Sequence, residues 1–193
     1  MNARTENNNI SLIGMPGVGK STVGILLAKT LNRNFIDTDV VIQSEENLSL
    51  QQIMQENGRD AFCELEERYV LQLSPHNAVI ATGGSVIYSS KAMQHLSHSG
   101  PVVHLDAPLA LVQSRVQNVG ERGVAMMPGQ MLNDLFDERQ PLYRRWADIT
   151  VDTTGRNQEE VVGQICQHVE QSNPGAGWEK QNRPEQREKQ QDV

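Results

Sequence analysis

Residues 14–21 read GMPGVGKS, and this short stretch decides the fold. It matches the pattern G-x-x-x-x-G-K-[ST], in which backbone amides converge on phosphate oxygens and a helix N-terminus adds positive charge. The apolar run NISLI at residues 9–13 predicts a strand before the loop, and an apolar stripe predicts a helix over residues 20–31 after it. A strand, this loop and a helix in that order predict a binding site for a nucleotide.

Side chains and backbone share the work in such a loop. Lys20 is expected to reach the β- and γ-phosphates of ATP, and the Ser21 hydroxyl is expected to bind Mg²⁺. The other nucleotide contacts are expected from residues of the loop and of the first helical turn: Gly14, Gly17, Val18, Gly19 and Thr22.

Short apolar runs alternate with helical patterns along the rest of the chain. Further strands are expected at residues 34–37, 78–82, 101–105 and 148–151. A capping-box pattern at residues 49–52 predicts a helix that ends near Gly58, and a second helix is expected over residues 60–73. This alternation predicts an α/β domain of the P-loop NTPase type, with a central parallel five-stranded sheet between two layers of helices.

Composition excludes several classes of function. The 193 residues carry a formal net charge of −7, which disfavours nucleic-acid binding, and no apolar run reaches the roughly 20 residues of a membrane span. The N-terminus lacks the pattern of a secretory signal, and Cys63 and Cys166 lie far apart, so a cytoplasmic protein without a disulfide framework is expected.

The two ends of the chain and one internal segment are expected to differ from the domain. Residues 1–8 are expected to be flexible, and the polar residues 172–193 to form a disordered tail after a domain that spans residues 9–171. Glycines, a proline and weak periodicity at residues 118–130 predict a mobile loop.

An acidic motif, FIDTD at residues 35–39, ends the second strand, and its side chains are expected to alternate along an extended segment. It places Asp37 and Asp39 at the edge of a parallel sheet where ligands bind. One carboxylate would hold the Mg²⁺ shell and the other an acceptor hydroxyl, although two solvated turn residues would give the same pattern. Beside a phosphate loop, the pair favours a small-molecule kinase.

These motifs together resemble the shikimate kinase family over nearly all of residues 9–170. The resemblance rests on GMPGVGKSTVG at residues 14–24, FIDTD at residues 35–39, IATGG at residues 80–84 and ERQPLY at residues 138–143, which contains the family's R-x-P-x-Y. It implies a commonly monomeric enzyme that converts shikimate and ATP to 3-phosphoshikimate and ADP with Mg²⁺.

The resemblance also implies roles for single residues. Asp37 would support Mg²⁺ through water, Asp39 would orient the acceptor hydroxyl, and Arg122 in the lid would stabilise charge during transfer, so that Lys20, Asp39 and Arg122 form the catalytic set. Arg139 would bind the acceptor carboxylate.

Other parts of the two binding sites are implied in the same way. Gly83 and Gly84 would lie beside the acceptor, and Arg115 and Arg156 beside the adenine. For each arginine, an ordinary surface ion pair is the alternative.

The chain departs from the family pattern on the acceptor side and in the lid. Cys63 stands where the family has an arginine that clamps the shikimate carboxylate, while the nearby Glu66 is kept, and both are expected at the acceptor site. Ser85 stands in the glycine motif, and Gly123-Val124-Ala125 replaces the usual residues after Arg122. Cys63 is interpreted as a small half-buried residue rather than a reactive thiol.

These departures leave several readings open. A shikimate-kinase-like enzyme is the first, and a kinase that binds L-homoserine through Arg139 and Glu66 is the second. A non-catalytic nucleotide-binding regulatory protein is an alternative from another class, and a nucleoside monophosphate kinase is a further one.

Overall fold

The computed structural model describes residues 8–116, 124–127 and 129–172. Their elements follow the order β1 (Ile10–Ile13), α1 (Lys20–Thr30), β2 (Asn34–Asp37), α2 (Thr38–Glu46), α3 (Leu50–Gln72), β3 (Ala78–Ala81), η1 (Val86–Tyr88), α4 (Ser90–Ser99), β4 (Val102–Asp106), α5 (Leu109–Arg115), α6 (Leu132–Trp146), β5 (Ile149–Asp152) and α7 (Gln158–Ser172).

The strands form one five-stranded sheet in the order β2-β3-β1-β4-β5, and all pairs are parallel. The central strand β1 pairs with two neighbours, so that Leu12 lies opposite Ala81 on one side and Val103 on the other. Every residue of β1 and β3 is buried, as the continuous apolar runs predict. Because the strands are parallel, their carboxyl ends meet at one edge, where the site is built.

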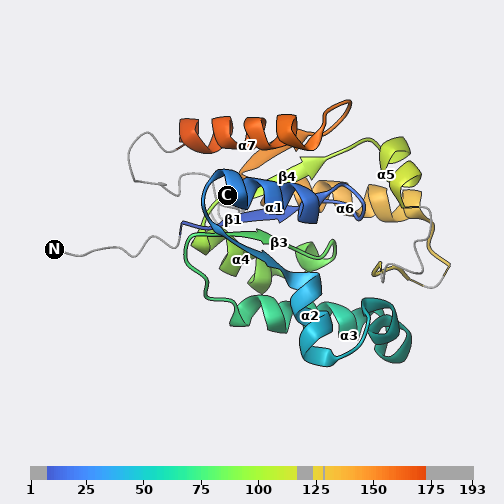
Figure 1. Ribbon diagram of the computed structural model, residues 1–193. Coiled ribbons are helices and arrows are strands. Elements are labelled where there is room, and N and C mark those ends of the chain that lie inside the picture. The colour runs from blue at the N-terminus through green and yellow to red at the C-terminus, as the bar shows by residue number, and fades with distance from the viewer. Residues whose placement is uncertain (1–7, 117–123, 128, 173–193) are drawn as a thin grey trace, which may run out of the picture.

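Helices cover both faces of the sheet. Helices α1 and α7 pack against each other on one face, whereas α4 contacts β1 and α6 contacts β4 from the other face (Figure 1). Helices on both faces are what right-handed connections between parallel strands produce when the strand order reverses, as it does here on either side of β1. The predicted three-layer α/β fold is confirmed.

Helix α3 changes direction within its length. Ser49 and Gln52 form the expected capping box: the Ser49 hydroxyl accepts from the Gln52 amide at 3.2 Å, and the Gln52 side chain accepts from the Ser49 amide at 2.9 Å. Gly58 then adopts non-helical angles, φ 78° and ψ 178°, which few other residues tolerate. The expected break near Gly58 is confirmed, and it sets the direction of the second half of α3.

The extended conformation expected for residues 35–39 is wrong after Asp37. Helix α2 begins at Thr38, and the Asp37 carboxylate caps it by accepting from the amides of Asp39 at 3.0 Å and Val40 at 3.4 Å. Aspartate is among the strongest N-caps, which is why the strand turns directly into a helix. Asp39 therefore lies in the first turn of α2.

Several expectations fall outside the described residues. These are the flexible N-terminus up to residue 7, Arg122 with most of the lid, and the tail from residue 173. Over the described ranges, no helix combines the length and the apolar character needed to cross a bilayer.

Candidate active site

The phosphate loop between β1 and α1 is held in shape by its glycines and by Lys20. Gly14 has φ 145°, and a Cβ there would lie 2.6 Å from the carbonyl oxygen of Leu105, so a side chain is excluded. The Lys20 ammonium donates to the carbonyl oxygens of Gly14 at 2.8 Å and Met15 at 3.0 Å. The Lys20 side chain thus folds back onto the backbone of the loop. Its ammonium group lies near the N-terminus of α1, where phosphate oxygens would bind.

Burial controls the charge of this lysine. It lowers the pKa of Lys20 to about 8, against the opposing effect of the Asp39 carboxylate and with a smaller contribution from the Arg139 guanidinium. Lys20 is therefore still mainly protonated at neutral pH. The protonated side chain can exchange its hydrogen bonds to the two backbone carbonyls for hydrogen bonds to a negatively charged ligand.

A cavity of about 330 Å³ opens beside Lys20. Its lining brings together segments that are distant in the sequence: Pro16, Gly17, Gly19, Lys20, Ser21, Thr22, Asp39, Leu50, Phe62, Glu66, Thr82, Gly83, Gly84, Ser85, Val124, Ala125 and Arg139. The phosphate loop forms one wall, and α2, α3, the loop after β3 and α6 form the others. A phosphate donor and a small polar acceptor can therefore meet in one space.

Asp39 presents an acidic oxygen to this cavity. The residue is half-buried, but its Oδ1 is buried and has no hydrogen-bond partner among the described residues. Burial raises the pKa of Asp39 to about 6, although the nearby Lys20 ammonium opposes the shift. A buried carboxylate oxygen without a partner among the described residues, near the lysine of the phosphate loop, is suited to accept a hydrogen bond from a hydroxyl group.

Two glycines after β3 allow this close approach. A Cβ on Gly83 would lie 1.8 Å from Glu66 Oε1 and 2.8 Å from Asp39 Oδ1, so both carboxyl groups border the same small space. A Cβ on Gly84 would lie 3.0 Å from Arg139 Nη1. A side chain at Gly83 would therefore displace Glu66, and one at Gly84 would be tight against Arg139, which is a physical reason for glycine in this motif.

Glu66 has a partner in Ser85, whose hydroxyl donates to Glu66 Oε2. Burial raises the pKa of Glu66 to about 8, and the negative charge of Asp39 acts in the same direction. Glu66 is therefore mainly a neutral acid at neutral pH. The serine in the glycine motif thus acts as a side-chain partner for the glutamate on α3.

Cys63 lies half-buried on α3 and is absent from the cavity lining, although its neighbours Phe62 and Glu66 line it. Burial, supported by the charge of Glu66, raises the pKa of the Cys63 thiol to about 11. A thiol that stays protonated is a poor nucleophile, which favours the interpretation as a small packing residue.

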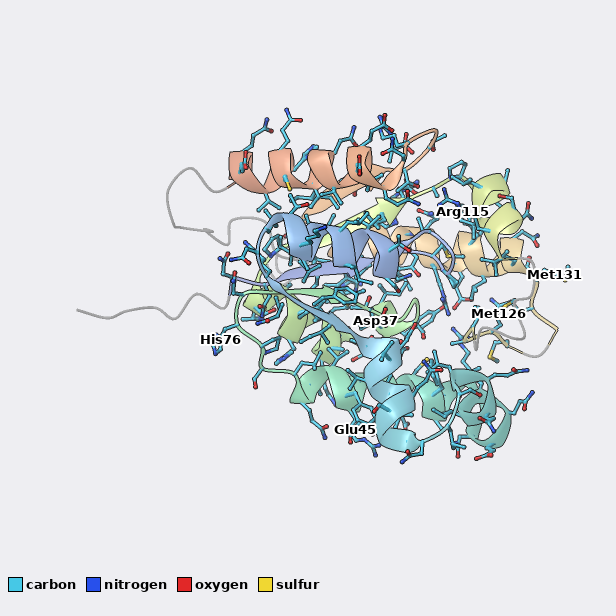
Figure 2. The ribbon with its side chains drawn as sticks, viewed as in Figure 1. Asp37, Glu45, His76, Arg115, Met126 and Met131 are labelled. Atoms are coloured by element: carbon cyan, nitrogen blue, oxygen red, sulfur yellow. The ribbon has the colours of Figure 1, made fainter. Side chains whose placement is uncertain are left out.

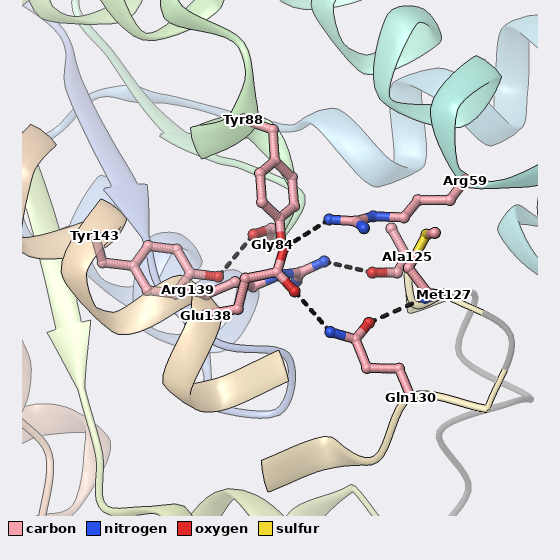
Figure 3. Close-up of polar contacts among 9 residues, drawn as sticks. All are labelled: Arg59, Gly84, Tyr88, Ala125, Met127, Gln130, Glu138, Arg139 and Tyr143. Carbon is pink, nitrogen blue, oxygen red and sulfur yellow. Dashed lines mark hydrogen bonds and ion pairs between the residues drawn. The ribbon is translucent and has the colours of Figure 1, made fainter. Parts of the chain in front are cut away.

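Arg139 is buried in a network of polar contacts (Figure 3). Its Nη2 donates to the carbonyl oxygen of Ala125 at 2.6 Å, and its Nε donates to the Tyr88 hydroxyl at 3.1 Å. Tyr143 donates to the Gly84 carbonyl at 2.7 Å on the other side of the same cluster. The guanidinium therefore links α6, η1 and the segment after the lid arginine while it faces the cavity.

A second cavity of about 340 Å³ continues from the phosphate loop on its other side. It is lined by loop residues, by α1, by Arg115 at the end of α5 and by residues that follow β5, among them Arg156 and Asn157. Arg115 donates to the carbonyl oxygen of Val18 at 3.3 Å, and Arg156 pairs with Asp152 at 3.3 Å. The structure thus places both arginines at one cavity beside the phosphate loop.

The two residues expected to bind metal lie near the same end of the sheet. Ser21 is exposed at the cavity, and Asp37 lies at the end of β2 (Figure 2). Over the described residues, no cluster of three or more His, Cys, Asp or Glu side chains is placed to hold an ion. This donor set fits a Mg²⁺ that arrives on a nucleotide and keeps several water ligands.

Sequence reasoning missed several residues of the acceptor side. Thr82 and Phe62 line the cavity, and Ser85, Val124 and Ala125, which also line it, were noted only as departures from the family pattern. Ala125 also packs in a small apolar cluster with residues of α2 and α3. The one usable signal was the pair of departures at positions 63 and 85, both of which lie near Glu66.

Comparisons with known proteins match this geometry. The family model described as shikimate kinase matches residues 16–170. The shikimate kinase of Persephonella marina is 36% identical over 162 residues, which cover 83% of this chain and 98% of that protein. The shikimate kinase of Haemophilus influenzae is 36% identical over 172 residues, or 87% of this chain and 96% of that protein.

Solved structures of shikimate kinases have the same fold as this chain. The shikimate kinase of Acinetobacter baumannii, in complex with shikimate, superposes with a TM-score of 0.80 at 32% identity and covers 86% of this chain and 95% of that one. The enzyme of Aquifex aeolicus gives a TM-score of 0.74 at 35% identity and covers 88% of this chain and 99% of that one. With the fold, the phosphate loop and the acceptor cavity in place, this chain is a phosphotransferase that acts on a hydroxyl group and belongs to the shikimate kinase family.

Proposed function

We propose that this protein transfers the γ-phosphoryl group of ATP to the 3-hydroxyl of shikimate. The observation that carries the proposal is the single cavity in which Lys20, Asp39 and Arg139 converge. These residues supply the three groups that such a transfer needs: a cation for the phosphates, a base for the hydroxyl and a guanidinium for the acceptor carboxylate.

The reaction would proceed in line across this cavity. Asp39 would hold the attacking hydroxyl through its buried Oδ1, and Lys20 would leave the carbonyls of Gly14 and Met15 to neutralise phosphate oxygens. Mg²⁺, held by Ser21 and Asp37, would supply charge neutralisation at the β- and γ-phosphates when bound. The second cavity, with Arg115 and Arg156, would take the adenine.

Closure of the site would exclude water. Val124 and Ala125 already line the cavity, and the Ala125 carbonyl is bonded to Arg139. We propose that Arg122, three residues before Ala125, closes over the phosphates and stabilises the charge that develops during transfer.

Shikimate is better supported than L-homoserine as the acceptor. An ammonium group would need an ionised Glu66, but burial keeps the pKa of Glu66 at about 8 and Ser85 already bonds its Oε2. Shikimate and L-homoserine both carry a carboxylate that Arg139 could bind, so the residue that distinguishes the two acceptors is Glu66. The retained Lys20 and Asp39 also favour catalysis over a purely regulatory role.

The test is ADP release with Mg·ATP and a panel of shikimate, L-homoserine, AMP, gluconate and no acceptor. Saturable turnover on shikimate is expected, with low ATP hydrolysis in its absence. Turnover of another acceptor with none of shikimate would overturn the proposal. ATP binding without ADP release for any member of the panel would also overturn it. We also propose a monomer that binds neither nucleic acid nor membranes, and the elution volume on gel filtration tests the first of these.

A further inference from the structure

Arg59 carries a guanidinium group close to the acceptor side, and the proposed phosphoryl transfer gives it no role. It follows Gly58 at the start of the second half of α3, and its side chain is 16% exposed. It lies four residues before Cys63, on the same side of the helix. Its Nη2 donates to Glu138 Oε1 at 2.8 Å, and its guanidinium carbon lies 4.6 Å from the centre of the Tyr88 ring (Figure 3).

Glu138 connects several elements around this arginine. Its Oε1 accepts from Arg59 and from the Tyr88 hydroxyl, the latter at 2.7 Å, and its Oε2 accepts from Gln130 at 2.6 Å. The Tyr88 hydroxyl in turn accepts from Arg139 Nε. The carboxylate of Glu138 is therefore separated from the Arg139 guanidinium by a single hydroxyl group.

This arrangement has a consequence for the charge at the acceptor site. Arg139 lines the cavity, whereas Arg59 and Glu138 lie behind it. If Glu138 had no cation of its own, the adjacent Arg139 would be its nearest strong counter-charge, and an acceptor carboxylate would have to compete for it. Because Arg59 neutralises Glu138, the positive charge of Arg139 stays available to the acceptor.

We propose that Arg59 is a positioning residue for acceptor recognition: through Glu138 and Tyr88 it keeps Arg139 free to bind the acceptor carboxylate. This inference rests on the proposed function. In this role Arg59, one helical turn before Cys63, supports acceptor binding without contact with the substrate. Removal of Arg59 should therefore weaken acceptor binding and leave ATP binding unchanged.

The first experiment measures the kinetics of Arg59→Ala with shikimate and Mg·ATP. We expect the KM for shikimate to rise about 10-fold, with the KM for ATP within about 2-fold of the unaltered protein. Arg68→Ala is the matched control, since Arg68 lies on the same helix, pairs with Glu46 at 2.7 Å and lies 5.1 Å from the Tyr69 ring. It should leave both KM values unchanged.

The second experiment separates charge balance from a structural role. In the double variant Arg59→Ala with Glu138→Gln, the uncompensated charge is gone, so the KM for shikimate should return to within about 3-fold of the unaltered value. A loss that came from damaged packing would instead add to that of Glu138→Gln. Shikimate methyl ester, which lacks the carboxylate charge, should show no difference between Arg59→Ala and the unaltered protein.

Each outcome bears on the proposal separately from the proposed function. If the unaltered protein does not turn over shikimate, the proposed function fails before Arg59 is tested. If it does, an unchanged KM in Arg59→Ala, a loss that Glu138→Gln does not relieve, or an equal loss with the methyl ester would each overturn the role of Arg59. Melting temperatures of all variants show whether a loss reflects unfolding.

Discussion

The nucleotide side and the acceptor side of this protein are two cavities of similar volume, about 340 and 330 Å³, that share the glycines of the phosphate loop. They are built in different ways. On the nucleotide side, the phosphate loop and the N-terminus of α1 depend on glycines and on loop geometry, and side chains such as Arg115 and Arg156 complete the cavity. The acceptor side is lined mainly by residues of α2, α3, the loop after β3 and α6, which the tertiary fold brings together.

This difference explains where the chain departs from its family. A backbone cradle tolerates few changes, and residues 14–24 keep the family pattern throughout. A cluster of side chains can change by compensating substitutions, and the departures on the acceptor side are Cys63 and Ser85. Recognition of the phosphate donor is therefore fixed by a motif, whereas recognition of the acceptor is set by pairs of side chains.

The largest effect is expected where the two sides meet. Asp39→Asn should lower kcat by roughly 10³-fold, because an amide cannot take the hydroxyl proton, while the Kd for ATP stays within about 2-fold. ADP release and a calorimetric titration with ATP measure the two effects. A loss of ATP affinity as large as the loss of kcat would show that Asp39 serves the nucleotide side instead.

A change confined to the acceptor side should follow in size. Arg139→Lys removes the two parallel hydrogen bonds that a guanidinium offers a carboxylate, and should raise the KM for shikimate about 100-fold with little change in the KM for ATP. Arg144→Lys, at an exposed position on the same helix, is the control. An equal rise in the KM for ATP would show that the acceptor side and the nucleotide side do not act separately.

The pH dependence tests both sides in one measurement. Since Asp39 has a pKa of about 6 and Lys20 of about 8, kcat/KM should fall about 10-fold per pH unit below 6 and again above 8. A flat profile from pH 5 to 7 would contradict an ionised Asp39 as the base.

The same pKa of Asp39 has a consequence for stability. Because it lies above the ordinary value of 3.8, the stability that Asp39 contributes is fully present below pH 3.8 and is lost as the pH rises through about 6. The ionised carboxylate therefore opposes folding, as expected for a group kept for function. Denaturant unfolding should show that Asp39→Asn is more stable, relative to the unaltered protein, at pH 7 than at pH 4.

A smaller effect is expected for the partner of Glu66. Ser85→Ala leaves the buried Glu66 without its hydroxyl donor, which should cost about 1–3 kcal/mol of stability and raise the KM for shikimate by about 3- to 10-fold. Urea unfolding and steady-state kinetics measure these effects, with Ser114→Ala, at an exposed position on α5, as the control. An unchanged stability would mean that Glu66 finds another partner.

The smallest effect is expected at Cys63. Since its pKa is raised to about 11, the thiol should react slowly with iodoacetamide at pH 8 in the folded protein, and Cys63→Ser should change kcat and both KM values by less than about 2-fold. Rapid labelling of Cys63, identified by mass spectrometry, would instead indicate a reactive thiol.

Much of the fold could be predicted because its signals are local. The phosphate loop, the buried strands and the capping box of α3 each depend on residues within a few positions of one another, and the structure confirms all three. The start of α2 was missed because Asp37 ends a strand and caps a helix at once, and an alternating acidic motif looks the same in either conformation.

By itself, the sequence determined the donor chemistry, because a phosphate cradle is made from consecutive residues. Only the tertiary structure decided the acceptor side. Arg59 meets Glu138 across 79 positions of the chain, and Ser85 meets Glu66 across 19. A parallel sheet brings the carboxyl ends of its strands to one edge whatever lies between them, so contacts between loops and helices at that edge follow the topology and leave no pattern in the sequence.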